Sequence, residues 1–247
     1  MQRVFLPPAN FAGERLQLSP DVAHYLRRVL RLSAGAEFVA LDGSGAQYRA
    51  RLLAEELTAE IVERLPDTAA AGVELTLYQG LPRSKRFALV LQKATELGVA
   101  RIVAVTTARS QVHLNAREAE RKLEHWQRIV TEAAEQCERP CAPEVLWMPD
   151  WAAALADWQA REVPGLLLDE TLAGTGPGAL RAQLDAWGRP PALALWVGPE
   201  GGFSPAEADA GRAAGLAAVG LGSRILRTET AALIACALVM YEYGELG

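Results

Sequence analysis

The pattern of apolar and polar positions along the chain changes near residue 72. Before it, the runs Glu37–Leu41 and Gln47–Leu53 read as two strands joined by a glycine-rich turn. Pro20–Leu32 has the start and stop residues of a short helix. Turn-forming and small residues gather over Leu65–Gly72, which reads as a linker. The first part of the chain is therefore expected to be a small β-rich module.

Beyond the linker, strand-like and helix-like segments alternate. The expected strands are Val73–Tyr78, Arg101–Val105, Gly165–Asp169, Ala192–Val197 and Ala217–Leu221. The expected helices are Arg86–Leu97, Ala116–Cys137 and Thr228–Tyr243. This alternation predicts a parallel sheet covered on both faces. The last helix is apolar on every side and should be buried all round. Since one domain face cannot cover it fully, a partner subunit is expected.

Composition narrows the class of protein. Half of the 247 residues are hydrophobic and 22% are charged, which is typical of a folded globular chain. The longest apolar run, Ala231–Tyr241, is too short to span a bilayer, and the N-terminus does not resemble a secretory signal. A cytoplasmic protein without a membrane partner is expected. The three cysteines and three histidines form no cluster with metal-ligand spacing, so no metal is expected.

The charge distribution is more informative than the net charge of −5. Residues 83–139 hold 11 basic and 7 acidic residues, whereas residues 140–247 hold 6 basic and 13 acidic ones. A basic middle on an acidic chain permits a local phosphate-binding face. A solvated helix face explains the same pattern equally well.

Two glycine-rich segments carry the clearest chemical signal. Gly198–Gly202 follows a strand, and a capping box led by Ser204 and Glu207 then starts a helix. Gly220–Thr230 also lies between a strand and a helix, about twenty residues further on. Ligands of open α/β sheets bind at the carboxyl ends of strands, so the two loops are expected to form one pocket, although a purely structural turn remains an alternative. Neither loop has the motif of a nucleotide triphosphatase or a dinucleotide enzyme.

Polar residues share faces of two helices. Arg86, Lys93 and Glu96 lie on one face of the first of these helices. Arg128, Glu132, Gln136 and Arg139 share a face of the long helix. These side chains form either solvated pairs or a polar wall beside the pocket.

Taken together, these segments resemble the bacterial RsmE family, which methylates N3 of a uridine in 16S ribosomal RNA. The resemblance covers nearly the whole chain. It rests on the segments His24–Leu32, Gln92–Gly98, Arg109-Ser110, Glu132–Gln136 with Arg139, Gly198–Gly202 and Leu221–Ala231.

The resemblance implies a fold, a cofactor and partners. The fold is α/β, with a PUA-like β-barrel that binds RNA over residues 1–70 and a SPOUT methyltransferase domain with a trefoil knot over residues 73–247. The cofactor is S-adenosylmethionine, the substrate is 16S ribosomal RNA within the small ribosomal subunit, and the enzyme is a homodimer. The expected cofactor-binding residues are Leu168, Val197, Gly198, Pro199, Glu200, Gly201, Gly202, Leu221, Gly222, Ser223, Ile225, Leu226, Thr230 and Ala231.

The sequence departs from the family pattern at two places. Arg83-Ser84 stands where relatives often have Lys-Gly, and arginine still contacts phosphate. Cys137 replaces a common serine, and this change is expected to be neutral.

Methyl transfer to uracil N3 needs charge stabilisation and the loss of a proton. Arg224 and Arg227 are expected to stabilise negative charge on the uracil oxygens. Glu200 or Glu229 is the candidate proton acceptor, although Glu229 also suits the first turn of a helix electrostatically. The expected RNA-contacting residues are Arg27, Arg28, Arg31, Arg83, Lys93, Arg109, Ser110 and Arg139. Methylation of a ribose 2′-hydroxyl or of another base, or a non-catalytic role in ribosome assembly, remain as alternatives.

Overall fold

The computed structural model describes residues 1–55, 57–66, 72–172 and 179–246. The chain divides into two compact units, Met1–Ala70 with Thr131–Ala142, and Ala71–Val130 with Pro143–Gly247. The linker expected at Leu65–Gly72 lies largely outside the described residues. The sequence did not predict that the short segment 131–142 joins the first unit.

The first unit is built on a six-stranded sheet with the order β1-β4-β5-β6-β3-β2. The strands are β1 (Arg3–Phe5), β2 (Phe11–Ala12), β3 (Arg15–Gln17), β4 (Glu37–Leu41), β5 (Gln47–Leu52) and β6 (Thr58–Arg64). All neighbours are antiparallel except β1 and β4. The predicted hairpin is therefore present as β4 and β5.

The helix predicted over Pro20–Leu32 is shorter and divided. Ser19 caps α1 (Pro20–His24) by accepting a hydrogen bond from the Val22 amide, and a π-helical turn, η2 (Tyr25–Val29), follows. The backbone of Arg31 is left-handed, with φ of 55°, and the helix cannot continue through it.

The second unit contains a six-stranded sheet that is parallel throughout, as predicted. Its order is β12-β10-β11-β7-β8-β9. The strands are β7 (Glu74–Gly80), β8 (Arg101–Val105), β9 (Glu144–Met148), β10 (Gly165–Leu168), β11 (Ala192–Val197) and β12 (Ala217–Val219). The near-continuous apolar sequence of these strands suits burial on both faces.

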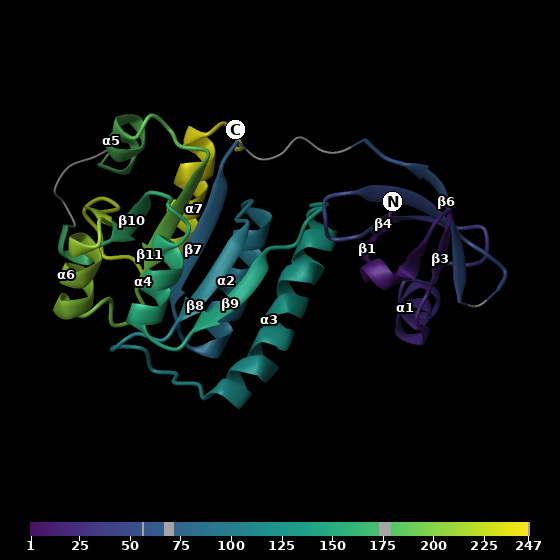
Figure 1. Cartoon of the computed structure of the whole chain (residues 1–247), viewed down its shortest axis with the longest axis horizontal. Helices are drawn as coiled ribbons and strands as arrows, with labels where there is room; N and C mark the ends of the chain where they lie inside the picture. The colour runs from purple at the N-terminus through teal and green to yellow at the C-terminus, as the bar shows by residue number, and fades with distance from the viewer. Residues whose placement is uncertain (56, 67–71, 173–178, 247) are drawn as a thin grey trace. The chain divides into compact units, whose positions relative to one another are not determined.

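Helices cover both faces of this sheet (Figure 1). One face carries α2 (Ser84–Glu96), α3 (Ala116–Gln136), α5 (Ala179–Ala186) and α7 (Thr228–Glu242). The other carries α4 (Trp151–Gln159) and α6 (Pro205–Ala213). Adjacent residues of β7 point to opposite cores, with Leu77 packed beneath α2 and α7 and Tyr78 stacked on Trp196 at 4.1 Å between ring centroids.

The apolar helix α7 is only partly covered by its own chain. It packs against α2, β7 and β11, with Ala235, Cys236 and Val239 fully buried. Ile234, Leu238 and Tyr241 point outward and are 45%, 41% and 61% exposed. The single chain therefore does not bury this helix all round, and the uncovered side is apolar.

A buried ionic network holds α4 against the sheet. Arg101 on β8 donates two hydrogen bonds to Asp157, at 2.8 and 2.9 Å, and the Tyr78 hydroxyl donates to the same carboxylate at 2.5 Å. The hydrogen bonds from Arg101 hold the pKa of Asp157 below its usual value. Burial raises the pKa of Tyr78. The network thus joins β7 and β8 to α4 and fixes this helix on the sheet.

Candidate active site

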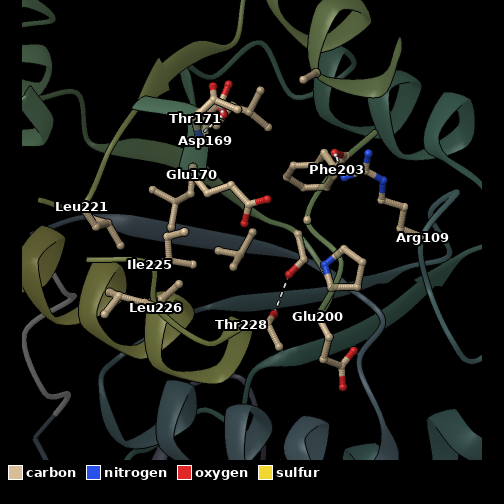
Figure 2. A pocket seen from close by; sticks show the side chains of 18 of the residues that line it. Arg109, Asp169, Glu170, Thr171, Glu200, Phe203, Leu221, Ile225, Leu226 and Thr228 are labelled. Carbon is tan, nitrogen blue, oxygen red and sulfur yellow. Dashed lines mark hydrogen bonds between the residues drawn. The ribbon is translucent and has the colours of Figure 1, made fainter. Parts of the chain in front are cut away.

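A cavity of about 470 Å³ opens at the carboxyl ends of β10, β11 and β12 (Figure 2). Most of the residues that line it fall within the segments 167–171, 197–203 and 219–228, without filling them, and others come from α6 and the start of α7. This volume lies in the range of cavities that bind small ligands and cofactors. Parallel sheets place such sites at the carboxyl ends of their strands.

The first glycine-rich loop is packed too tightly for larger residues. A Cβ atom at Gly80, the last residue of β7, would lie 2.5 Å from Pro199 Cδ. A Cβ atom at Gly198 would lie 2.9 Å from Gly202 Cα, and Gly202 itself has a φ of +67°. Glycine is therefore required at these positions both for space and for backbone conformation.

Hydrogen bonds join this loop to the second one. Thr228, the first residue of α7, donates its hydroxyl to the Gly198 carbonyl at 2.5 Å. The buried Gln79 amide donates to the Thr228 hydroxyl at 2.9 Å and to the Gly198 carbonyl at 3.2 Å. The two glycine-rich segments thus meet at one cavity, as their positions in the sequence predicted.

An ion-pair cluster fixes the loop from the side of α2. Arg86 donates to Glu200 Oε1 at 3.0 Å and lies 3.8 Å from Glu229 Oε1. The Arg83 amide also donates to Glu200, at 3.1 Å. Both glutamate side chains are 13% exposed, and each has a buried Oε2 with no hydrogen-bond partner among the described residues. One arginine therefore holds two carboxylates, one in each loop region.

Arg109 supports the same loop from the segment that follows β8. Its guanidinium donates to the carbonyls of Gly201 and Phe203 at 2.9 and 3.1 Å. The neighbouring Ser110 is buried, and its hydroxyl accepts a hydrogen bond from the Thr107 amide at 3.1 Å. Both residues were predicted to contact RNA phosphate, and the structure gives each of them a local hydrogen-bonding role.

The second loop contributes an apolar wall and two arginines. Leu221, Ile225 and Leu226 line the cavity, and Ile225 is 77% exposed. Arg224 and Arg227 also line it and are exposed, and their guanidinium groups have no hydrogen-bond or ion-pair partner among the residues described. Two cationic groups are therefore available at the mouth of the cavity.

Most of the predicted cofactor residues line the cavity. They are Leu168, Val197, Gly198, Pro199, Glu200, Gly202, Leu221, Gly222, Ile225, Leu226 and Ala231. Gly201, Ser223 and Thr230 are absent from its lining within the described chain. Of the four predicted catalytic residues, Arg224, Arg227 and Glu200 line the cavity, whereas Glu229 is absent from its described lining and lies 3.8 Å from Arg86.

The predicted RNA-contacting residues are distributed over both units. Arg28 and Arg31 are exposed on the first unit, where Arg27 donates to the carbonyls of Leu53 and Glu55. Arg139 belongs to the same unit, and burial lowers its pKa. In the second unit Arg83 donates to Gln111 at 2.7 Å, and Lys93 pairs with Glu96 at 2.8 Å.

Sequence reasoning missed the acidic end of β10. Asp169, Glu170 and Thr171 line the cavity, as do Phe203 and Arg212. No glycine-rich motif marks this strand. The available signal was the polar sequence directly after an apolar strand, but its value depends on β10 lying between β11 and β12.

Two features are absent from the described residues. No three or more His, Cys, Asp or Glu side chains among them are grouped as metal ligands would be. None of the helices described there combines the length and the apolarity that crossing a membrane requires.

Both parts of the chain match known protein families. Residues 70–240 match a family described as an RNA methyltransferase domain, and residues 18–62 match an RNA methyltransferase PUA domain. A ribosomal RNA small subunit methyltransferase E from Synechocystis is 36% identical over 96% of this chain and 76% of its own. The Bacillus subtilis protein of that name is 27% identical, over 98% and 97% of the two chains.

Solved structures of methyltransferases also resemble the chain over nearly its whole length. A ribosomal RNA small subunit methyltransferase E from Neisseria gonorrhoeae, bound to S-adenosylmethionine, is 32% identical with a TM-score of 0.82, over 98% of this chain and 97% of its own. A putative methyltransferase from Legionella pneumophila, also with this cofactor, is 28% identical with a TM-score of 0.82, over 97% and 96%. The predicted fold class, a PUA-like barrel before a SPOUT α/β domain, is confirmed.

Proposed function

The chain belongs to the ribosomal RNA small subunit methyltransferase E family, and on this premise we propose that it transfers a methyl group from S-adenosylmethionine to N3 of a uridine in 16S ribosomal RNA. The observation that carries the proposal is the single cavity formed by the two glycine-rich loops. Relatives at 28% and 32% identity are described as bound to this cofactor.

The residues of the cavity fit such a donor. Apolar side chains at one end suit a purine, and the compact Gly198–Gly202 loop lets a ligand approach its backbone. The donor supplies the methyl group and its own leaving group. The protein therefore has mainly to hold the two reactants in line and to exclude water.

Arg224 and Arg227 are the residues proposed to act on the base. A uracil that loses its N3 proton carries negative charge on its carbonyl oxygens, and a guanidinium group placed there stabilises that charge. Both arginines are exposed at the cavity, and their guanidinium groups have no partner among the described residues. The target base must leave any stack or pair to reach them.

The proton acceptor is proposed to be Glu200 or Glu229. Each has one carboxylate oxygen without a hydrogen-bond partner in the described chain. Arg86 holds the other oxygen of each, and the Glu200 carboxylate in Figure 2 points away from Glu170. Their proposed role therefore combines fixing the loop with receiving a proton, and solvent is the alternative acceptor.

The exposed basic residues are proposed to bind the RNA backbone. Arg28 and Arg31 on the first unit have the exposure that phosphate contacts need. Such contacts position an RNA without reading its sequence. Replacing both by Ala is expected to weaken RNA binding and to flatten its salt dependence.

The test is methyl transfer to isolated small ribosomal subunits with labelled donor, followed by nucleoside analysis. We expect 3-methyluridine as the product. Arg227→Ala should lower turnover about 100-fold with little change in donor affinity, because oxyanion contacts act mainly in the transition state. Arg117→Ala, an exposed arginine on α3, is the matched control. Unchanged turnover in Arg227→Ala would remove that residue from the mechanism.

The same assay separates the alternatives. A 2′-O-methylated nucleoside or another methylated base would assign the chain a different RNA methyltransferase activity. Donor binding without methyl transfer to any form of the subunit would favour a non-catalytic assembly factor. Absence of donor binding in calorimetry would refute the proposed function itself.

We also propose that the protein is a cytoplasmic homodimer joined through α7. Ile234, Leu238 and Tyr241 lie at positions i, i+4 and i+7, and therefore share one exposed face of the helix. Such an apolar stripe suits the same stripe of a second copy. Leu238→Glu should yield a monomer in analytical ultracentrifugation, whereas a wild-type monomer would refute the dimer.

A further inference from the structure

One acidic side chain faces the cavity without a partner. Glu170, directly after β10, lines the cavity and forms no hydrogen bond or ion pair with any other described residue. A Cβ atom at Gly202 would lie 2.8 Å from Glu170 Oε1, so the carboxylate reaches the surface of the first glycine-rich loop. Figure 2 shows the carboxylate directed into the cavity.

The backbone that carries Glu170 is firmly held. The Asp169 carboxylate accepts hydrogen bonds from the amide and hydroxyl of Thr171, at 2.9 and 2.6 Å. On the other side, a Cβ atom at Gly220 would lie only 2.5 Å from the Leu172 carbonyl oxygen, so the second loop packs directly on this turn. Glu170 is therefore presented at a fixed place between the two loops.

The chemistry of a carboxylate limits its possible ligands. An ionised carboxylate only accepts hydrogen bonds, so its ligand must donate them. The proposed methyl donor offers an adenine amino group, two ribose hydroxyls and an ammonium group. In Figure 2 Glu170 lies between the apolar side chains of Leu221 and Ile225 and the guanidinium of Arg109. A purine fits the apolar end and a methionyl carboxylate fits the cationic end, which leaves the ribose beside Glu170.

We infer that Glu170 binds the two adjacent hydroxyls of the donor's ribose, an inference that rests on the proposed function. The two hydroxyls of a cis-diol donate to the two oxygens of one carboxylate. Dinucleotide-binding α/β folds use an acidic side chain for the same ribose contact. The residue thereby selects ribonucleoside ligands over their deoxy analogues.

The first test uses calorimetry with three ligands that share the ribose: S-adenosylmethionine, S-adenosylhomocysteine and methylthioadenosine. Glu170→Ala should weaken all three by the same factor, about 10- to 100-fold, the range expected for a charge-assisted contact. Glu170→Gln keeps one acceptor oxygen and should weaken them less. The inference would be overturned if the variant lost affinity only for the two ligands with an ammonium group, S-adenosylmethionine and S-adenosylhomocysteine. A loss of affinity only for the sulfonium ligand S-adenosylmethionine, or no loss at all, would overturn it as well.

A second arm changes the ligand instead of the protein. The 2′-deoxy and 3′-deoxy forms of methylthioadenosine should bind the wild type more weakly than the intact ligand, and Glu170→Ala should not distinguish the three. Glu120→Gln, an exposed acid on α3, should keep every affinity. Because Glu170 is exposed, its variants should melt at the wild-type temperature. A wild type that binds none of the ligands refutes the proposed function, whereas unaffected variants of a binding wild type refute only the role of Glu170.

Discussion

Replacing Arg86 by methionine should destabilise the second unit through the two glutamates that it leaves behind. Removing one partner of a buried ion pair costs about 3–5 kcal/mol, and an exposed pair contributes less than about 1 kcal/mol. The Arg86 side chain is 35% exposed, and those of Glu200 and Glu229 are 13% exposed. An intermediate loss of about 2 kcal/mol follows, which lowers the melting temperature by about 4–8 °C in a unit of this size.

The assay is urea unfolding at neutral pH and fixed protein concentration, because any dimer would couple stability to concentration. Lys85→Met, an exposed change at the neighbouring position of α2, is the control. The triple variant Arg86→Met, Glu200→Gln, Glu229→Gln should recover much of the loss, since it no longer buries unpaired charge. Equal stability of Arg86→Met and Lys85→Met would refute the claim that this cluster holds the loop.

Three further predictions concern other parts of the second unit. Gly80→Ala places a Cβ atom 2.5 Å from Pro199 Cδ, so it should lower stability by about 1–3 kcal/mol and donor affinity at least tenfold. An unchanged donor affinity in calorimetry would contradict this. Asp157→Asn should destabilise the protein at pH 7, and the difference in unfolding free energy between wild type and variant should shrink below about pH 4. The hydrogen bonds from Arg101 lower the pKa of Asp157 in the folded state, so their stabilisation is lost as the carboxylate is protonated. Urea titrations from pH 3 to 7 measure this difference, and a difference that stays constant would exclude the prediction. Burial raises the pKa of Cys236 to about 12, so its thiol should resist labelling at pH 8 until guanidinium chloride unfolds the chain. Labelling of all three cysteines in the native state would disprove that burial.

The sequence predicted those parts of the fold that depend on local patterns. Apolar runs predicted β7, β8, β10, β11 and β12, and glycines with a capping box predicted the two loops of the cavity. The edge strand β9 was missed, and Glu144–Met148 is only partly buried, unlike the strands at the centre of the sheet. The association of residues 131–142 with the first unit was also missed. It depends on contacts such as the Phe5 amide to Glu135 at 2.9 Å, which join residues 130 positions apart.

The sequence predicted only those parts of the candidate site that have a recognisable local motif. The two glycine-rich loops have one, but the position of Glu170 beside them follows from the strand order of the sheet, which no single segment encodes. Arg109 shows the converse. Its charge suggested phosphate, whereas Nη1 of its guanidinium donates to the carbonyls of Gly201 and Phe203, which lie 92 and 94 positions along the chain.

The position of β10 in the sheet has a consequence for synthesis of the chain on the ribosome. Its two neighbours, β11 and β12, both follow it in the sequence. At about 5–20 residues per second, the 49 residues from Leu168 to Ala217 take about 2–10 seconds to translate. The leucines of β10 lack both pairing strands until β11 (Ala192–Val197) is synthesised, and they lack β12 for the whole interval. One edge of β10 therefore stays unpaired and open to chaperones until translation is nearly finished.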